Sequence, residues 1–204
     1  SIHKETPVVV VENSNNKNFK LKIENTFKNV NCFLAGENKG YSTANNIGLK
    51  YVETKYALVL NPDTILHKSA IKNFFSTTLR IQDFWLIGPA NDQMINLDFT
   101  DDNLKEVNNL KGFAIFFNMS KFNDKFFDEN FFLFFEEIDL CKRVKNNKGK
   151  IYLDKSIIIK HEGSNSVSTK NLKELEKNRN WHWMWSTFYY QKKYKGFLLA
   201  FIIV

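Results

Sequence analysis

Tyr56–Thr64 has the sequence YALVLNPDT, an apolar run that ends in a polar turn. Unbroken apolar runs are typical of strands that are covered on both faces, as in parallel sheets. The residue before a proline is kept out of the helical region, so we expect the strand to end at Asn61. The stretch therefore predicts a buried strand with Asp63 just beyond its carboxyl end.

Similar strands and helices are expected to alternate on either side of this stretch. Val8–Val11 is a β-branched run that ends at Glu12, and a short strand is predicted near Asn31–Leu34. The helices predicted here run from a cap at Ser42 or Thr43 to Thr54, and from His67 to Leu79. This alternation favours an α/β fold with a mostly parallel sheet flanked by helices. Because ligands bind at the carboxyl ends of parallel strands, Glu12 and Asp63 are the first functional candidates.

The second half of the chain has a different pattern. The elements predicted there are strands at Trp85–Ile87 and Gly112–Asn118, a helix from Glu136 to Asn147 that ends at Gly149, and a β segment at Ile151–Lys160. We interpret the polar stretch from Pro89 to Asn109 as a surface loop over the site.

Composition limits the classes of protein to which the chain can belong. The 204 residues suffice for one domain, and a hydrophobic fraction of 43% excludes a disordered chain. The net charge of +7 favours anionic partners such as nucleotide phosphates or a membrane surface. The basic residues are scattered and no nucleic-acid module is recognisable, so we expect no nucleic-acid partner. Cys32 and Cys141 are expected to be reduced thiols of a cytoplasmic protein.

The C-terminal region predicts an amphipathic, aromatic helix at Leu172–Tyr194, followed by lysines and the apolar run Phe197–Val204. The eight residues of this run cannot span a bilayer, which needs roughly 20. Aromatic and lysine side chains beside an apolar segment suit a peripheral membrane contact or a truncated membrane segment, and a helix that packs on the core is the alternative. We therefore divide the chain into a catalytic domain at 1–170 and a C-terminal helix with an apolar tail at 171–204.

Two single residues are candidates for binding a metal ion. Asp63 suits Mg²⁺ or Mn²⁺ together with diphosphate oxygens, although a turn aspartate that caps the next helix gives the same pattern. His161 ends a predicted strand, where its imidazole can bind a metal or a phosphate oxygen or serve only the structure.

Two further groups are candidates for catalysis and anion binding. Glu136, Glu137 and Asp139 form a carboxylate cluster that supplies a general base or simply caps a helix. The loop and helix entry at Asn38–Gly48 bring glycines to a helix N-terminus, which favours an anion such as diphosphate.

Together these segments resemble glycosyltransferase family 2, which has the GT-A fold, and especially its rhamnosyltransferase-like bacterial members. The resemblance extends over about residues 8–195. It rests on five segments in the family's order: VVVVENS at 8–14, NKGY at 38–41 with NIG at 46–48, LVLNPDT at 58–64, DEN at 128–130 with FEEIDLC at 135–141 and Arg143, and IKH at 159–161 with Ser164.

The resemblance implies a role for each matching residue. Glu12 would contact the nucleoside, Asp63 and His161 would hold Mg²⁺ or Mn²⁺ at the diphosphate, and Glu137 would be the general base. The remaining positions would shape the nucleotide-sugar pocket (Asn13, Asn38, Gly40, Asn46 and Asn61) or support the start of the acidic helix (Glu136, Asp139 and Arg143).

The chain departs from the family pattern at several positions. Glu12 and Glu137 stand where the family usually has aspartate. Asn61 replaces the first acid of the D-x-D motif, so we expect a lower metal affinity. The family's first strand has no counterpart in this sequence, and we interpret the catalytic domain as truncated at its N-terminus.

The main hypothesis is an inverting glycosyltransferase that moves a sugar from a UDP-, dTDP- or GDP-sugar to a hydroxyl of a glycan or lipid-linked acceptor. It would act in cell-surface polysaccharide synthesis at the cytoplasmic face of the cell membrane. The alternative is a non-catalytic GT-A-fold module that binds or assembles a glycan-synthesis complex, which the missing strand favours. A sugar nucleotidyltransferase is disfavoured, since no glycine- and basic-rich phosphate loop is visible near the N-terminus.

Overall fold

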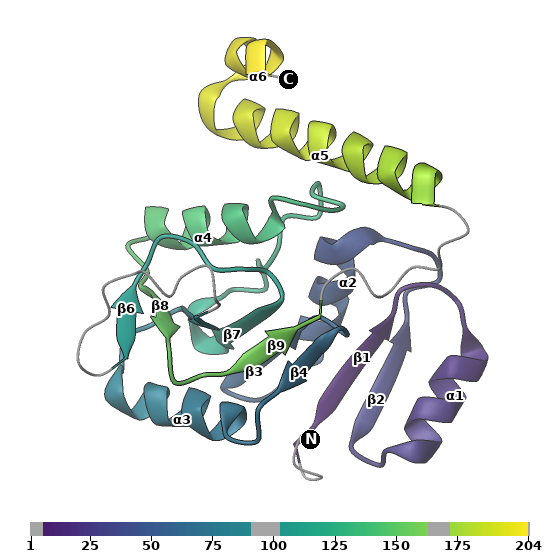
Figure 1. Ribbon diagram of the computed structural model, residues 1–204, viewed down its shortest axis with the longest axis vertical. Coiled ribbons are helices and arrows are strands. Elements are labelled where there is room, and N and C mark those ends of the chain that lie inside the picture. The colour runs from purple at the N-terminus through teal and green to yellow at the C-terminus, as the bar shows by residue number, and fades with distance from the viewer. Residues whose placement is uncertain (1–5, 91–102, 163–171, 204) are drawn as a thin grey trace. The chain divides into compact units, whose positions relative to one another are not determined.

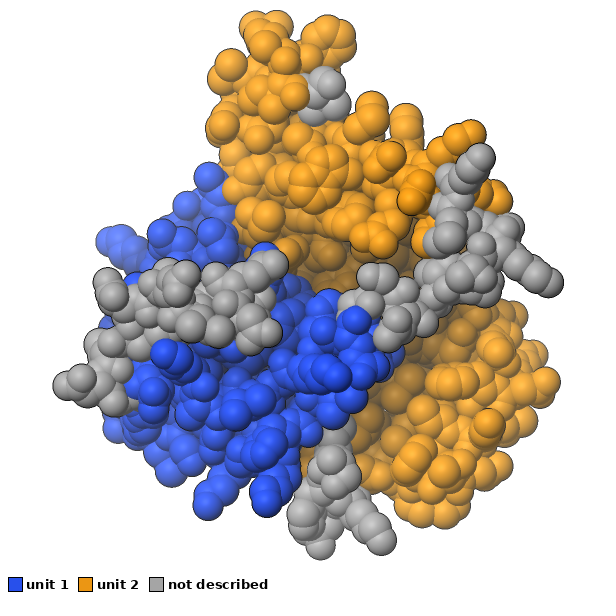
Figure 2. All heavy atoms as spheres, in the orientation of Figure 1, with its two compact units in different colours: residues 1–4, 53–123, 140–166 blue, residues 5–52, 124–139, 167–204 orange. Residues whose placement is uncertain are grey.

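The structure, a computed structural model, describes residues 6–90, 103–162 and 172–203. These residues form two compact units (Figure 2). The first unit holds 53–90, 103–123 and 140–162, and the second holds 6–52, 124–139 and 172–203. Most of the loop predicted over the site and the motif residue Ser164 lie outside the described residues.

The first unit is built on a five-stranded sheet (Figure 1). Its strands lie in the order β3 (Tyr56–Leu60), β7 (Ala114–Asn118), β5 (Leu86–Pro89), β8 (Ile151–Asp154) and β6 (Leu104–Glu106). A separate antiparallel pair consists of β4 (Thr64–Leu66) and β9 (Ile159–His161). The helical elements are α3 (Ala70–Arg80), the short 3-10 helix η2 (Met119–Lys121) and most of α4 (Glu136–Asn146).

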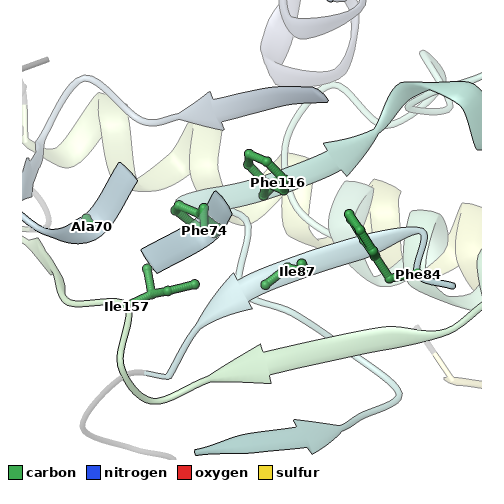
Figure 3. Close-up of a cluster of buried hydrophobic side chains, with 6 residues drawn as sticks. All are labelled: Ala70, Phe74, Phe84, Ile87, Phe116 and Ile157. Atoms are coloured by element: carbon green, nitrogen blue, oxygen red, sulfur yellow. The ribbon is translucent and has the colours of Figure 1, made fainter. Parts of the chain in front are cut away.

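A cluster of buried apolar side chains fixes α3 to this sheet (Figure 3). Its members are Ala70, Phe74, Phe84, Ile87, Phe116 and Ile157. Phe74 of α3 stacks on Phe116 of β7, with ring centroids 4.8 Å apart. Burying one such side chain stabilises a fold by roughly 1.5–3 kcal/mol, so the cluster is a main source of this unit's stability.

The second unit begins with a parallel strand pair. β1 (Val8–Glu12) pairs with β2 (Val30–Leu34), and α1 (Lys17–Thr26) connects the two strands. α2 (Gly40–Leu49) packs closely on β1, because a Cβ atom at Gly48 would lie 3.2 Å from Val11 Cγ2. The start of α4 belongs to this unit, as do α5 (Leu172–Lys195) and α6 (Phe197–Ile203).

The aromatic helix predicted from Leu172 is observed as α5, and its rings make contacts on two faces. Trp183 and Tyr190 contact Phe135, with ring centroids 5.3 Å apart in both pairs. On another face, Phe188 meets Phe197 of α6 edge to face at 5.9 Å. None of the helices in the described part of the chain is both long and apolar enough to cross a membrane.

The α/β class is confirmed, but the sheets are mixed rather than mostly parallel. Among the described strand pairs, β1–β2 and β5–β8 are parallel. The pairs β3–β7, β5–β7, β6–β8 and β4–β9 are antiparallel. A parallel pair needs a crossover connection, usually a helix. The strand–helix alternation that predicts such crossovers is confined to the first half of the chain.

Some predicted boundaries are also wrong. α2 begins at Gly40 rather than after a cap at Ser42 or Thr43, because the carbonyl of Phe132 accepts the Tyr41 N–H at 2.7 Å. α3 begins at Ala70, after the unpredicted strand β4. The β segment predicted at 151–160 divides into β8 and β9. Beyond α4, Lys148 adopts the left-handed conformation, with φ 58°, in place of Gly149.

Candidate functional site

Asp63 and His161 are neighbours in the first unit. The register of β4 and β9 pairs Thr64 with His161, which places Asp63 beside the end of β9. Asp63 Oδ1 lies 3.2 Å from His161 Nε2, and the Glu162 N–H donates to the Asp63 carbonyl at 3.0 Å. Two residues that are distant in sequence therefore present a carboxylate and an imidazole at one place.

The turn that carries Asp63 is fixed by hydrogen bonds around Asn61. The Asn61 N–H donates to the Phe113 carbonyl at 2.9 Å, and the Thr64 hydroxyl donates to the Asn61 carbonyl at 2.7 Å. The Phe113 ring also stacks on the His161 imidazole, with centroids 4.9 Å apart and an interplanar angle of 9°. Phe113 thus supports both halves of the pair.

The donor set of this pair fits a divalent cation that shares its coordination with a substrate. Among the described residues, no group of three or more His, Cys, Asp or Glu side chains could hold a metal ion. The pair itself offers one oxygen and one nitrogen donor, and the Asp63 and His161 side chains are 19% and 35% exposed. The carboxylate oxygen suits Mg²⁺ and Mn²⁺ alike. Phosphate oxygens and water would complete either site.

The carboxylate cluster occupies the first turn of α4, where the helix dipole stabilises negative charge. Its three members are Glu136, Glu137 and Asp139. The two preceding residues, Phe134 and Phe135, adopt left-handed φ angles of 71° and 69°. Such strain costs of order 1–3 kcal/mol per residue and occurs preferentially at functional sites. The backbone therefore turns sharply just before the carboxylates.

Glu136 is an unusual carboxyl group. It is 6% exposed, and its Oε2 atom has no hydrogen-bond partner among the described residues. Burial and, to a smaller extent, repulsion from Glu137 raise its pKa to about 8. Burial and the two glutamates also raise the pKa of the Tyr41 phenol. Glu136 therefore keeps its proton at neutral pH and is a poor general base there.

Asp139 is fully buried and is hydrogen-bonded to α5. Lys193 Nζ lies 2.6 Å from Asp139 Oδ1, and the Tyr194 hydroxyl donates to the same oxygen at 2.7 Å. Arg143 lies one turn further along α4, in the first unit. Lys193 and Tyr194, which the sequence motif did not indicate, thus hold Asp139 at the start of α4.

Three of the predicted nucleotide-binding residues hold one loop together. Asn13 Nδ2 donates to Asn38 Oδ1 at 3.1 Å and to the Gly40 carbonyl at 3.2 Å. Asn13 Oδ1 accepts the Lys39 N–H at 2.9 Å. Gly40 has a φ of +76°, and a Cβ atom there would lie 2.4 Å from the Phe132 carbonyl oxygen. This position therefore requires glycine.

Glu12 closes the turn that follows β1. Its carboxylate accepts the Ser14 hydroxyl at 2.6 Å and the Asn16 N–H at 2.9 Å. These two hydrogen bonds lower the pKa of Glu12. The side chain is consequently ionised at neutral pH and is directed by its own turn.

Asn46 is buried in α2 and ties this helix to the segment at 127–129. Its amide nitrogen donates to the Phe127 carbonyl and to Glu129 Oε1, both at 2.9 Å. Its amide oxygen accepts the Phe127 N–H at 3.0 Å. Asn46 therefore has a structural set of hydrogen bonds, whereas the resemblance implied only that it would shape the nucleotide-sugar pocket.

The predicted site residues are divided between the two units. The first unit contains Asn61, Asp63, Arg143 and His161, and the second contains Glu12, Asn13, Asn38, Gly40, Asn46, Glu136, Glu137 and Asp139. Within the units, the structure brings together Asp63 with His161, and Asn13 with Asn38 and Gly40.

Sequence comparison decides the family. The sequence model described as Glycosyl transferase family 2 matches residues 2–141. The chain belongs to glycosyl transferase family 2. It is also 27% identical over 163 residues to the low-salt glycan biosynthesis hexosyltransferase Agl10 of Haloferax volcanii. That match covers 67% of this chain and 52% of Agl10, so the chain spans about half the length of this relative.

Solved structures of glycosyltransferases share the GT-A fold of this family 2 chain. GalNAc-T7, crystallised with UDP, GalNAc and Mn²⁺, superposes with a TM-score of 0.63 and 12% identity, covering 92% of this chain and 44% of its own. TarS 1-349 of S. aureus, in complex with UDP-GlcNAc, superposes with a TM-score of 0.55 and 16% identity, covering 89% of this chain and 59% of its own.

Several supporting residues in this family 2 chain were not indicated by the motifs. They are Phe113 beside His161 and Lys193 with Tyr194 beside Asp139. Of these three, Tyr194 had a signal in the sequence, because the spacing of Tyr190 and Tyr194 marks one face of a helix. Glu129, which accepts a hydrogen bond from Asn46, and Tyr41, near the glutamates, stand within the quoted motif segments, but no role was predicted for either.

Proposed function

We propose that this family 2 chain takes part in glycosyl transfer from a nucleotide-diphosphate sugar, with inversion at the anomeric carbon. The observation that carries the proposal is the contact between Asp63 and His161 at the ends of two paired strands. The membership in family 2 supports it. The name of Agl10 as a hexosyltransferase and the UDP and Mn²⁺ bound to GalNAc-T7 support the same class of reaction.

Asp63 and His161 would hold the divalent cation, either Mg²⁺ or Mn²⁺. When bound, such an ion acts as a Lewis acid that stabilises the charge of the leaving diphosphate. Asn61 and Phe113 keep the two ligands in place through the turn and the ring stack.

Glu137 would be the general base. It would accept the proton of the acceptor hydroxyl, whose oxygen attacks the anomeric carbon as the bond to the diphosphate breaks on the opposite face. Glu136 retains its own proton, since its pKa is about 8, and so does not compete for this role at neutral pH. Asp139 and Arg143 would support the start of α4.

The nucleotide portion of the donor would be bound by residues of the second unit. Glu12 would contact the nucleoside, and the loop held by Asn13, Asn38 and Gly40 would present backbone groups to it. Asn46 would position this region through its hydrogen bonds to 127–129. UDP is the first nucleotide to test because both structural neighbours contain it, and dTDP and GDP are the alternatives.

The acceptor would be a glycan or lipid-linked sugar in cell-surface polysaccharide synthesis at the cytoplasmic face of the membrane. Support comes from α6, in which Phe197, Leu198, Phe201 and Ile202 are 58%, 79%, 74% and 78% exposed. Lys195, the last residue of α5, is separated from this helix by Gly196 alone and suits anionic lipid headgroups. Residues 171–204 would thus form the membrane-contacting part and residues 1–170 the catalytic part.

A thermal-shift panel tests the proposal. UDP, GDP, dTDP and CDP are each added with and without Mn²⁺ to the wild-type chain and to Asp63→Ala. A ligand at 100 times its dissociation constant adds about 2.7 kcal/mol of stability, which for a domain of this size is roughly 5–10 °C. We expect one nucleotide to give this shift only with Mn²⁺ and only in the wild type.

The panel also separates the proposal from its rivals. No shift with any nucleotide would favour a non-catalytic GT-A module. With a sugar donor and acceptor, release of nucleoside diphosphate supports glycosyl transfer, whereas release of pyrophosphate would indicate a nucleotidyltransferase.

A further inference from the structure

Lys193 connects two carboxylates on different segments of the second unit. Its Nζ atom lies 2.6 Å from Asp139 Oδ1 and 2.7 Å from Asp128 Oδ2. Tyrosines of the same helix complete the arrangement, since the Tyr194 hydroxyl donates to Asp139 at 2.7 Å and the Tyr189 hydroxyl donates to Asp128 at 3.0 Å. The last two turns of α5 thus bind both acids.

This arrangement is electrostatically demanding, because Asp139 has no exposed surface and the Asp128 side chain is 16% exposed. A buried carboxylate needs an opposite charge and hydrogen bonds to stay ionised. Burial raises the pKa of Asp128, but the hydrogen bonds from Lys193 and Asn130 outweigh it and hold that pKa at about 2. Lys193 is therefore a structural counter-ion rather than a solvated surface lysine.

The same helix face also holds the strained turn that precedes Glu136 and Glu137. Trp183 lies against Phe134 and Phe135, with ring centroids 5.3 Å away in both pairs. The buried Ser186 hydroxyl donates to the Leu133 carbonyl at 2.8 Å. Two consecutive bulky residues with positive φ persist only where surrounding contacts impose them. These contacts come from α5.

We infer that α5 positions the carboxylates at the start of α4, and that Lys193 is the positioning residue on which turnover at Glu137 depends. Asp139 lies two residues beyond Glu137 in the same turn, and its N–H donates to the Phe135 carbonyl at 2.8 Å. Fixing Asp139 therefore fixes the direction in which α4 leaves the strained turn. The consequence for turnover rests on the proposed function, whereas the positioning itself does not.

The test compares Lys193→Met with the wild type in two assays. The first is hydrogen exchange at the amides of residues 133–139, and the second is steady-state release of nucleoside diphosphate. We expect at least tenfold faster exchange of the Asp139 amide and at least a tenfold lower kcat, while nucleotide affinity stays within about twofold. Lys193→Arg restores the charge and should recover both. The matched control is Lys177→Met, an exposed lysine of α5, which should change neither.

A second variant keeps the test independent of folding. Tyr194→Phe removes a single hydrogen bond to Asp139, and we expect a smaller change in the same direction in both assays. Unchanged exchange in both Lys193→Met and Tyr194→Phe would overturn the inference. Faster exchange with unchanged kcat would overturn the link to turnover. A wild-type chain that transfers no sugar would overturn the proposed function, and the exchange assay would still decide the role of Lys193.

Discussion

At the residue scale, Glu136 and Glu137 are adjacent acids to which the structure gives different environments. Glu136 is buried and Glu137 is partly exposed. The sequence predicted the cluster but could not rank its members, because the burial that raises the pKa of Glu136 to about 8 depends on side chains from distant segments. Asp63 and His161 were individually predictable as residues at strand ends. Their contact was not predictable, because it depends on the pairing of β9 with β4, and the sequence did not indicate strand β4.

Replacing Glu137 by glutamine tests its role as the base. The amide cannot accept the proton of the acceptor hydroxyl, so we expect turnover to fall by about 10²-fold or more with donor affinity unchanged. Rates of nucleoside diphosphate release and nucleotide-induced thermal shifts provide the two readouts. Glu174→Gln, at an exposed acid of α5, is the control. If Glu137→Gln retains full turnover, the base lies elsewhere.

Replacing Glu136 by glutamine should change how stability depends on pH. The unfolded carboxyl titrates near 4.5 and the folded one near 8, so only the unfolded state ionises between these values. Wild-type stability therefore declines through this range as pH rises, and glutamine removes the decline. We expect the melting temperature of Glu136→Gln relative to wild type to increase steadily from pH 5 to pH 8.

Melting curves at half-unit pH intervals provide this measurement. Glu174→Gln again serves as the control, since an exposed acid should leave the pH dependence unchanged. Parallel curves for Glu136→Gln and the wild type would show that Glu136 ionises normally in the folded chain.

At the element scale, the entry of α2 depends on a close approach between Gly40 and Phe132. Alanine at Gly40 would adopt an unfavourable φ of +76° and place its Cβ 2.4 Å from the Phe132 carbonyl oxygen. Gly36 has a similar φ of +85°, but a Cβ atom there would have no neighbour within 4 Å, so Gly36 isolates the backbone cost. We expect Gly36→Ala to cost about 1–2 kcal/mol and Gly40→Ala to cost more than about 3 kcal/mol. Urea unfolding measures both, and equal costs would exclude the contact with Phe132.

The helices and strands themselves were predictable to different degrees. Val8–Glu12 and Tyr56–Leu60 formed strands as their apolar runs indicated, and α5 begins at Leu172 as expected. The start of α2 and the pair β4–β9 were missed for a common reason. Their backbone groups are satisfied by segments distant in sequence, Phe132 in one case and the other strand in the second. Local propensity contains no information about such partners.

At the scale of the whole molecule, the order of several weak motifs identified the family more reliably than any single residue. The family match at 2–141 includes the segments around Glu12, Asp63 and Glu137. The fold class followed from the same segments, whereas the mixed pairing of the five-stranded sheet did not, because β6 and β7 lack the helical crossovers that indicate parallel strands.

The proposed membrane contact also belongs to the scale of the whole molecule, since it would combine the charge of +7 with the exposed apolar surface of α6. Phe201→Glu with Ile202→Glu places two charges on this surface, and we expect binding to anionic phosphatidylglycerol vesicles to weaken at least about tenfold. The control is Leu79→Glu, because Leu79 of α3 is at least as exposed, at 83%, but belongs to the other unit. Vesicle sedimentation at low and high salt measures both. Salt screens the attraction between lysines and anionic lipids, so wild-type binding should decrease as the salt concentration rises. Equal binding of the α6 variant and the wild type would place the membrane contact elsewhere.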